Sequence, residues 1–220
     1  MADIKLKSDK VHQRYYNAER KRLPGVTTIT GVLDKPALKA WANRIGLDGI
    51  DMKSYVDKRA EMGTCAHDII EAYLNDQKID KSEWAPVVVD QAENSLLSFL
   101  NGIEKHEYKV IATEQQMISE QMQIGGTCDI IWEWDGVPTL TDLKTGKGIY
   151  PEMFCQAIAY AEISKENGYP IEQVSILNVP RAEDEEFSHV FVKPEHYPIY
   201  KDIFLNCLAI YQLKKKVKWY

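Results

Sequence analysis

Two aspartates and a lysine in the middle of the chain have the types and the spacing of a metal-dependent hydrolytic site. Asp135-Gly136 is a strong signal for a two-residue hairpin turn, and it lies midway between Asp129 and Asp142. We therefore expect the two carboxylates nearly opposite each other on neighbouring strands. Lys144 points the same way as Asp142, because residues two apart in a strand share a face.

The chemistry that such a cluster could perform is phosphoryl-oxygen chemistry. Paired carboxylates with open positions suit a hard cation such as Mg²⁺ or Mn²⁺, which keeps waters and accepts phosphate oxygens. A lysine beside them can hold a nucleophilic water or stabilise charge on a phosphate. An ordinary surface Asp–Lys pair has the same D-x-K sequence, and it is the better interpretation of those residues taken alone. The surrounding pattern decides between the two.

The elements that must position these side chains are two strands and a helix. The runs 130–134 and 137–143 are rich in β-branched, aromatic and apolar residues, as is typical of paired strands. After Pro151, a suitable first-turn residue, the apolar period changes to that of a helix. Gln156 and Tyr160 are one helical turn apart, so they share a face of that helix.

In this order the motifs resemble those of the RecB-like exonuclease branch of the PD-(D/E)XK nuclease superfamily. That branch carries G-x-x-D, then D-x-K-T-G, then a helix with Q-x-x-x-Y. The matching segments here are Gly126 to Asp129, Asp142 to Gly146, and Gln156 to Tyr160. The resemblance implies a metal-dependent DNA exonuclease that leaves 5′-phosphate products, in phage or related DNA recombination, repair or replication.

The resemblance also implies a division of roles. It implies five catalytic residues: Asp129, Asp142, Lys144, Gln156 and Tyr160. The two aspartates and the carbonyl of Leu143 are expected to hold one or two Mg²⁺ or Mn²⁺ ions. The lysine is expected to orient the attacking water, and the glutamine and tyrosine to orient the lysine or the scissile phosphate.

Two further metal ligands are implied upstream. His67 lies in a predicted helix over 54–76, where a lone histidine is usually a surface or hydrogen-bonded residue. The RecB-like branch has G-x-x-x-H on this helix with a metal-ligating histidine, and Gly63 and His67 match it. Glu114, on a strand predicted over 108–117, matches by position the acidic residue that completes the metal shell in the family. A solvated strand residue is an equal alternative for Glu114.

The remaining patterns predict an α/β fold with a central mixed β-sheet flanked by helices, which is the PD-(D/E)XK core that the resemblance implies. Further helices are predicted over 35–45, 86–103 and 194–218, and further strands over 173–179 and 187–192. With 220 residues, we expect a single nuclease domain. Residues 1–50 are expected to form an N-terminal segment with a short helix, and residues 51–220 the catalytic core.

Three features of the chain bear on substrate contact. Leu23 to Thr30 resembles the P-S-V-T-x-I/V segment of phage and mitochondrial-maintenance exonucleases of the branch, with Gly25 at the position of Ser. Trp41 is expected to be a core anchor rather than a base-stacking platform. Gly125-Gly126 lacks side chains, so we expect close approach of a phosphate or a metal there.

The distribution of charge is compatible with a nucleic-acid partner although the net charge is −6. Basic residues gather in residues 1–24 and 212–220, around an acidic body. This pattern fits phosphate binding at a localised groove and fits solvated tails equally well. We expect the partner to be DNA, as a single strand or as the free ends of a duplex. A phage recombination or single-strand-binding protein is the expected protein partner.

Cysteine spacing and hydropathy exclude several other classes of protein. The four cysteines are far apart and form no C-x-x-C, so we expect core thiols rather than a zinc site, a disulfide framework or an iron–sulfur cluster. No apolar run approaches the roughly 20 residues that span a bilayer, and the first residues do not form a signal peptide. We therefore expect no membrane association and a cytoplasmic location, the host cytoplasm if the protein is phage-encoded.

Three alternative functions remain open on the sequence. The first is a non-catalytic nucleic-acid-binding module that keeps the nuclease fold, although such a module is expected to have lost a carboxylate or the lysine. The second is a structure-specific endonuclease of the same superfamily. The third is a carboxylate-pair hydrolase acting on sugars, which has no use for a lysine in a D-x-K motif.

Overall fold

The structure is a computed structural model that describes residues 14–33, 36–182 and 185–217. Its helices are α2 (Val26–Thr30), α3 (Pro36–Leu47), α4 (Met52–Leu74), α5 (Pro86–Ile103), α6 (Pro151–Glu166) and α7 (Tyr197–Lys216). Its strands are β1 (Tyr15–Tyr16), β2 (Arg22–Leu23), β3 (Tyr108–Ser119), β4 (Ile124–Trp134), β5 (Val137–Thr145), β6 (Gln173–Val179) and β7 (Ser188–Phe191). Every helix and strand predicted above is present, and most ends agree to within a few residues, but β4 begins six residues before the predicted run 130–134.

Some expectations fall outside the described residues. Residues 1–13, 34–35 and 218–220 include part of both basic ends and the predicted start of the short helix. The division of the chain at residue 50 stays a prediction. The strands β1 and β2 and the helix α2 are additions that the sequence patterns did not predict.

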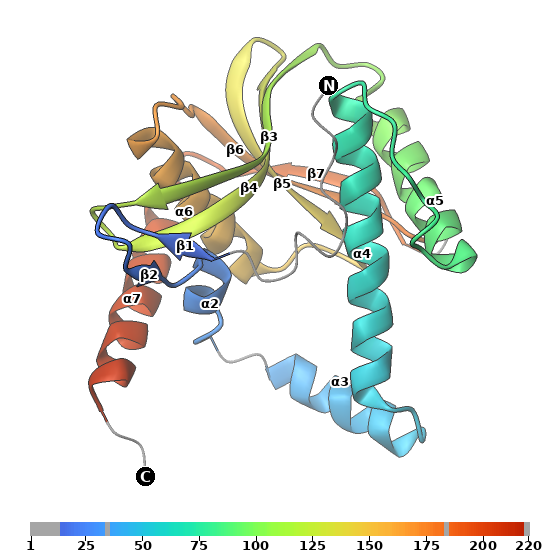
Figure 1. Cartoon of the computed structure of the whole chain (residues 1–220), viewed down its shortest axis with the longest axis horizontal. Helices are drawn as coiled ribbons and strands as arrows, with labels where there is room; N and C mark the ends of the chain where they lie inside the picture. Colours follow the sequence, from blue (N-terminus) through green and yellow to red (C-terminus); the bar gives the residue numbers. More distant parts are fainter. Residues whose placement is uncertain (1–13, 34–35, 183–184, 218–220) are drawn as a thin grey trace.

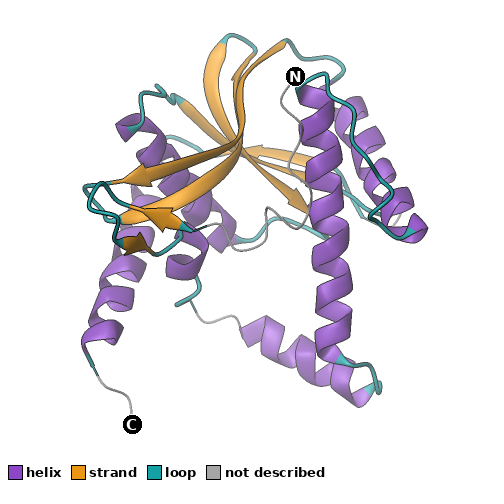
Figure 2. Ribbon diagram, viewed as in Figure 1, coloured by secondary structure: helices purple, strands orange, loops and turns teal. Residues whose placement is uncertain are grey.

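Strands β3 to β7 form one mixed sheet in the order β3-β4-β5-β6-β7. β5 and β6 are parallel, and every other neighbouring pair is antiparallel. A parallel pair needs a crossover connection, and α6 supplies it. The predicted α/β fold with a central mixed sheet flanked by helices is therefore confirmed (Figures 1 and 2).

Helices cover both faces of the sheet (Figure 1). One apolar cluster joins α2, α6 and α7 to the sheet, and a second joins α4 and α5 to the opposite face. Residues of β4 alternate between the two clusters, with Ile131 in the first and Ile130 and Trp132 in the second. This is the period of two expected of a strand that is buried on both faces.

The predicted hairpin between β4 and β5 is present. Asp135 and Gly136 have φ angles of +48° and +81°, and a positive φ at both central residues is the requirement of a type I′ turn. From Trp134 opposite Val137, the antiparallel pairing continues to Ile130 opposite Thr141. The sequence signal at the turn therefore set the register of both strands correctly.

Beyond Ile130 and Thr141 the two strands separate and the sheet forks. β4 continues alongside β3 as far as Ile124, whereas β5 continues alongside β6 as far as Thr145. In Figure 1, β3 and β4 curve to the left of the view while β5 runs toward α4. The next position on each strand after the last pair is an aspartate, so the candidate carboxylates lie where the sheet divides.

The helix α3 and the first half of α4 form an arm that projects from the sheet (Figure 1). On this arm the ring of Trp41 packs edge-on against Tyr55, with centroids 5.7 Å apart. Trp41 is half-buried and belongs to none of the apolar clusters. The expectation that Trp41 anchors the core was wrong, because α3 contacts α4 rather than the sheet.

Gly125 and Gly126 make room for tyrosine rings, where we expected a phosphate or a metal. A Cβ atom on Gly125 would lie 2.1 Å from Cγ of Tyr15, and one on Gly126 would lie 2.6 Å from Cε1 of Tyr160. Two tyrosine rings thus lie against the backbone of β4, where the sequence suggested a phosphate or a metal. The hydroxyl of Tyr15 also bonds Oγ1 of Thr127 at 3.0 Å, which ties β1 to β4.

The cysteines are buried, free thiols: Cys65, Cys128, Cys155 and Cys207. Within the described ranges, no helix combines the length and the apolar character needed to cross a membrane.

Gly125→Ala tests the contact between Tyr15 and β4. The added methyl overlaps the ring, so we expect the free energy of unfolding to fall by roughly 1–3 kcal/mol, the usual cost of overpacking. Gly148→Ala is the matched control, because nothing lies within 4 Å of its added Cβ. Urea unfolding measures both variants, and equal stability of the two would contradict the observed packing.

Candidate metal centre

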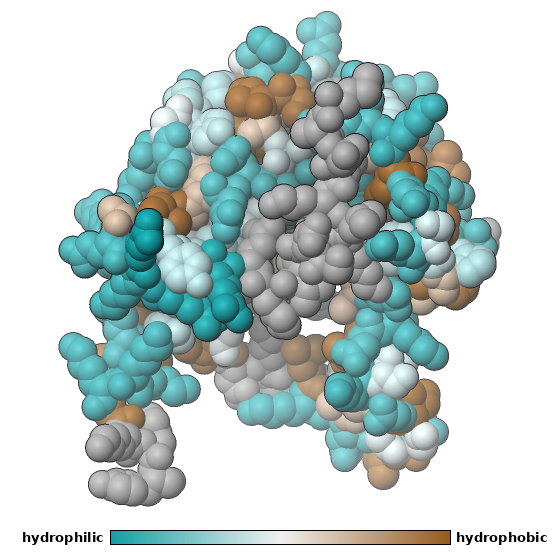
Figure 3. Space-filling view, in the orientation of Figure 1, coloured by the Kyte–Doolittle hydropathy of each residue, from teal (hydrophilic) through white to brown (hydrophobic). Residues whose placement is uncertain are grey.

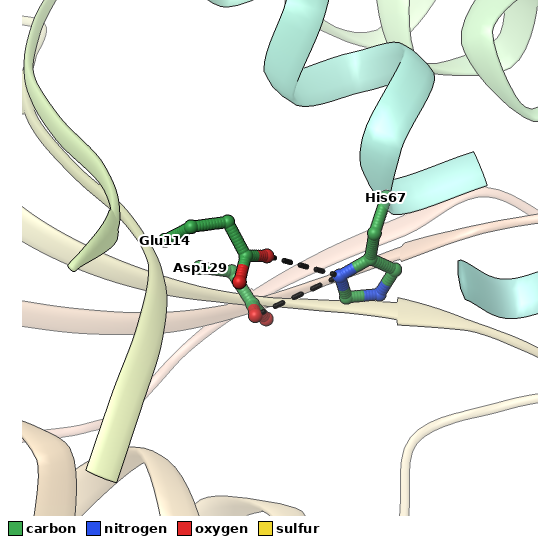
Figure 4. Close-up of side chains that lie close together, drawn as sticks. All are labelled: His67, Glu114 and Asp129. Atoms are coloured by element: carbon green, nitrogen blue, oxygen red, sulfur yellow. Dashed lines mark ion pairs between the residues drawn. The ribbon is translucent and has the colours of Figure 1, made fainter. Parts of the chain in front are cut away.

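Side chains from three elements meet at the fork of the sheet. His67 on α4 has its Nδ1 atom 3.6 Å from Oδ1 of Asp129 on β4 and 3.9 Å from Oε1 of Glu114 on β3 (Figure 4). One candidate ligand atom from each residue lies within 4.8 Å of the others. The structure therefore brings together three residues that stand far apart in the sequence.

The position of His67 depends on a close approach of α4 to the end of β5. A Cβ on Gly63, one helical turn before His67, would lie 3.0 Å from Oγ1 of Thr145. Thr145 belongs to the D-x-K-T-G segment, so the glycine lets the helix pack against the strand that carries Asp142 and Lys144. The group that Gly63 accommodates is therefore a threonine side chain.

Glu114 has an unusual backbone conformation. Its φ is +44°, in the left-handed region that non-glycine residues rarely adopt. The pairing of Thr113 with Ile130 and of Gln115 with Cys128 places Glu114 across from Asp129. Strain of this kind costs on the order of 1–3 kcal/mol and occurs preferentially at functional sites. Here it accompanies a carboxylate directed at His67.

Asp129 bridges the fork. Its Oδ2 accepts a hydrogen bond of 2.7 Å from the backbone N–H of Leu143. The carboxylate therefore takes the place of the backbone acceptor that a continued β4–β5 ladder would have offered. The expected role of the Leu143 carbonyl as a metal ligand stays a prediction, since the described contact of this peptide group involves its amide.

Asp142 and Lys144 form a second pair beside the three-residue group. Nζ of Lys144 lies 2.6 Å from Oδ2 of Asp142, as their shared face on β5 predicted. The Asp142 side chain is 1% exposed, and apart from this ion pair neither of its oxygens has a hydrogen-bond partner within the described chain. Buried carboxylate oxygens are nearly always bonded, so Asp142 retains lone pairs that a cation can use.

The geometry fits a divalent cation. Ligands coordinated at about 2.0–2.1 Å lie roughly 3–4 Å apart around an octahedral ion, which accommodates the separations of 3.6 Å and 3.9 Å. A cavity of about 10 Å³ is lined by these three residues and by Leu143. About 10–15 Å³ is the space of a single water-sized sphere. One imidazole and two carboxylates are suitable ligands for such an ion.

The electrostatics of the group also favour a cation. Burial, reinforced by the charge of Asp142, raises the pKa of Asp129 to about 7, although His67 and Lys144 oppose the shift. Burial lowers the pKa of His67, but the charges of Asp129 and Glu114 outweigh it, so the net shift is upward. Protons therefore stay on this group at higher pH than usual, and a divalent cation can replace them.

Lys144 stays charged in this setting. Burial disfavours its ammonium, but the carboxylates of Asp142 and Asp129 outweigh burial and raise its pKa. The predicted contact of Lys144 with Gln156 and Tyr160 is not found among the described residues, because Asp142 holds the ammonium instead. Gln156 donates a hydrogen bond of 2.8 Å to the hydroxyl of Tyr160.

Tyr160 connects the metal centre to a larger groove. Burial and the charges of Asp142 and Asp129 raise its pKa well above the usual range, so its hydroxyl remains a donor at neutral pH. The groove has a volume of about 840 Å³. Tyr160 and Glu114 line it together with Thr127 of β4 and with residues from both ends of the described chain: Arg14, Tyr15, Arg22, Leu23, Pro24, Gly25, Thr27, Thr28, Tyr211 and Lys215.

Part of this groove belongs to segments that the sequence analysis singled out: Thr127 lies in G-x-x-D, Tyr160 ends Q-x-x-x-Y, and Thr27 and Thr28 lie between Leu23 and Thr30. The motifs did not include the other tyrosines and the basic residues of the groove, which are Arg14, Tyr15, Arg22, Tyr211 and Lys215. The clustering of basic residues at both ends of the chain was the signal that pointed to the three cations.

Comparison with known proteins gives weak similarities only. No protein-family model matches the chain, and no curated protein matches its sequence. It is similar to a crystal structure named "Putative exonuclease" from Eubacterium rectale, with a TM-score of 0.48 and 13% identity over 71% of this chain and 69% of that chain. It is also similar to the crystal structure of SSO0001, with a TM-score of 0.28 and 14% identity over 57% and 66% of the two chains. At these levels neither similarity says what this chain does.

Asp129→Asn tests the electrostatics of the metal-free group. The pKa of Asp129 rises from 3.8 to about 7 on folding. A raised pKa stabilises the fold at low pH, and this stability is lost as the pH rises through the folded pKa. The free energy of unfolding of wild type, relative to Asp129→Asn, should therefore fall between about pH 4 and about pH 8.

Urea unfolding in EDTA across this pH range measures the difference. Asp135→Asn is the control, because hydrogen bonds from His106 and from the amide of Glu107 lower the pKa of Asp135. The contribution of Asp135 to the free energy of unfolding changes at lower pH, and it increases rather than decreases as the pH rises. The difference in the free energy of unfolding between wild type and Asp129→Asn should change with pH. A difference that is the same at every pH would contradict the raised pKa of Asp129 in the folded protein.

Proposed function

We propose that this chain is a metal-dependent nuclease that hydrolyses phosphodiester bonds of DNA. The observation that carries the proposal is the convergence of His67, Glu114 and Asp129 beside the Asp142–Lys144 pair at the fork of the sheet. A cation site with an adjacent ammonium is suited to a phosphate, which carries negative charge before and during its hydrolysis.

His67, Glu114 and Asp129 bind the cation in this proposal, with Asp142 and the carbonyl of Leu143 as further ligands. A bound Mg²⁺ or Mn²⁺ polarises a phosphoryl oxygen and lowers the pKa of a coordinated water toward neutrality. The hydrogen bond from the Leu143 amide fixes one oxygen of Asp129, which leaves the other directed toward His67. The centre is thus held in position before substrate arrives.

Lys144 orients the nucleophilic water and stabilises the charge that develops on the phosphate. The water oxygen would attack phosphorus in line and release a proton to solvent, the bond from phosphorus to the 3′ oxygen would break, and the departing oxygen would take a proton from solvent. The phosphate remains on the 5′ side. Asp142 keeps the ammonium of Lys144 in place, because Oδ2 of Asp142 lies 2.6 Å from its nitrogen.

Tyr160 contacts the substrate from the groove side. Its hydroxyl accepts a hydrogen bond from Gln156, which leaves the hydroxyl proton free to be donated. Tyr160 lines the groove next to Glu114, so it can donate that proton to a phosphate oxygen. Of the two roles expected for the Q-x-x-x-Y pair, orientation of Lys144 or of the scissile phosphate, the proposal takes the second.

The exonuclease specificity of the proposal is supported by the motifs. G-x-x-D, D-x-K-T-G and Q-x-x-x-Y occur here in the order of the RecB-like branch, with G-x-x-x-H upstream. They favour a DNA exonuclease that acts at free ends and leaves 5′ phosphates, in phage or related recombination, repair or replication.

The decisive assay compares end-labelled linear DNA with covalently closed circular DNA, each with Mg²⁺ or Mn²⁺ and again with EDTA. We expect degradation of the linear DNA with metal and none with EDTA. Intact closed circles identify an exonuclease, whereas nicking or linearisation identifies an endonuclease. No metal-dependent cleavage of either substrate would overturn the proposal.

Asp142→Asn and Lys144→Ala test the catalytic pair. Asp142→Asn should nearly abolish cleavage, because it removes the charge that holds both the cation and the ammonium. Lys144→Ala should lower kcat by roughly 10²–10³-fold, by comparison with other lost electrostatic stabilisers. Steady-state kinetics on the linear substrate measure both, and Asp135→Asn at the opposite end of the same hairpin is the control.

Metal affinity separates catalysis from structure for Lys144. Removing a positive charge next to a cation should leave its affinity unchanged or raise it. If Lys144→Ala binds metal more weakly and keeps its rate, the lysine has a structural role instead.

His67→Ala tests the imidazole ligand. We expect Mn²⁺ affinity to fall by at least about tenfold and added Mn²⁺ to restore part of the activity. Calorimetric titration measures the affinity. His106→Ala is the control, since His106 also faces a carboxylate, with Nδ1 2.8 Å from Oδ2 of Asp135. Equal affinity in the two variants would remove His67 from the metal centre.

A further inference from the structure

The groove beside the metal centre is formed by the two ends of the described chain. Arg14 and Arg22 reach it from the β1–β2 hairpin and its approach, and Lys215 reaches it from the last turn of α7. Figure 3 shows the most hydrophilic colours gathered over the β1–β2 hairpin at the left of the view. Described residues of the two basic ends of the sequence thus meet in space.

The cations of this groove have no carboxylate partners inside the described part of the chain. None of Arg14, Arg22 and Lys215 takes part in an ion pair there. The ammonium of Lys215 lies over the ring of Tyr211, 4.6 Å from its centroid. Among the described residues that line the groove, Glu114 is the single acidic one.

Hydroxyl groups and aromatic rings accompany the cations. Tyr15, Tyr160 and Tyr211 line the groove, together with the threonines of α2 and β4. A positively charged groove with aromatic side chains is the common surface for a single polynucleotide strand, because phosphates meet the cations while bases meet the rings. A volume of about 840 Å³ is at the upper end of ordinary ligand sites, which span about 300–1,000 Å³.

The groove and the metal centre share a residue. Glu114 lines both the groove and the small cavity beside His67 and Asp129. A phosphate at the metal centre would therefore have its neighbouring nucleotides beside Glu114 and Tyr160, at the near end of the groove.

We propose that this groove binds one strand of DNA next to the scissile phosphate and that the C-terminal turn of α7 is part of the binding surface. Arg14, Arg22 and Lys215 bind successive phosphates, and Tyr211 supports Lys215 and offers a ring edge to a base. This inference rests on the proposed function for the identity of the ligand and extends it to a binding site that the motifs do not contain.

Lys215 has a second explanation that the test must separate from binding. Lys214, Lys215 and Lys216 all lie in the last turn of α7, where positive charge stabilises a helix through its dipole. That effect is shared by all three lysines, whereas only Lys215 lines the groove. Lys216 is therefore a matched control, because it has the same charge as Lys215 and lies in the same turn of α7.

The experiment is fluorescence anisotropy with a labelled oligothymidylate in EDTA, titrated at several salt concentrations. Lys215→Gln is compared with Lys216→Gln, and Arg22→Gln with Lys21→Gln, since Lys21 is in the same hairpin and outside the groove lining. We expect a several-fold loss of affinity for Lys215→Gln and Arg22→Gln. Each should also flatten the slope of log K against log salt by about 0.7, the value for one phosphate contact on a single strand.

The outcomes separate this inference from the proposed function. Binding is measured without metal, so a protein that cleaves DNA but binds equally well in Lys215→Gln and Lys216→Gln overturns the groove and leaves the nuclease intact. A protein that shows the expected loss but never cleaves supports the groove and overturns the nuclease. A blunt duplex that competes as well as the single strand overturns the single-strand assignment. Circular dichroism confirms that each variant is folded before it is compared.

Discussion

The hydrogen bond from the Leu143 amide to the Asp129 carboxylate is the contact on which the site depends. Backbone pairing between β4 and β5 ends at Ile130 and Thr141, so both strands would present unpaired polar groups at the fork. A buried amide without a partner costs about as much as a lost hydrogen bond. The carboxylate supplies the missing acceptor and is thereby fixed where the strands separate.

This arrangement is electrostatically and conformationally unfavourable, and a bound cation would reduce its electrostatic cost. Asp129, Glu114 and Asp142 lie close together around a single imidazole and a single ammonium. Asp142 is buried with lone pairs unused, and Glu114 holds a left-handed backbone conformation. Buried carboxylates that lie close together and backbone strain are both destabilising. The rest of the fold, with apolar clusters on both faces of the sheet, must maintain them.

Two tyrosines that lie against β4, one from β1 and one from α6, join the core to the groove. Tyr15 and Tyr160 lie against Gly125 and Gly126, so the backbone of β4 forms a floor beneath both rings. Tyr15 brings the β1–β2 hairpin, and with it Arg22, to the side of the metal centre. Packing of the N-terminal hairpin and presentation of positive charge to a substrate are therefore consequences of the same contact.

Local chemistry in the sequence determined the hairpin, the crossover helix and the side of β5 that carries Asp142 and Lys144. The turn dipeptide Asp135-Gly136 and the strand period act within a few residues, so they can be recognised without the fold. The partnership of His67 and Glu114 with Asp129 was implied by a motif resemblance, and the packing of α4 and the bend at Glu114 brought it about. The basic ends of the sequence were compatible with a phosphate-binding groove, but the residues that line it could not be predicted, because Arg14, Arg22 and Lys215 come from opposite ends of the chain. Only the packing of β1, β2 and α7 around the sheet, driven by apolar burial with no local sequence signature, places them together.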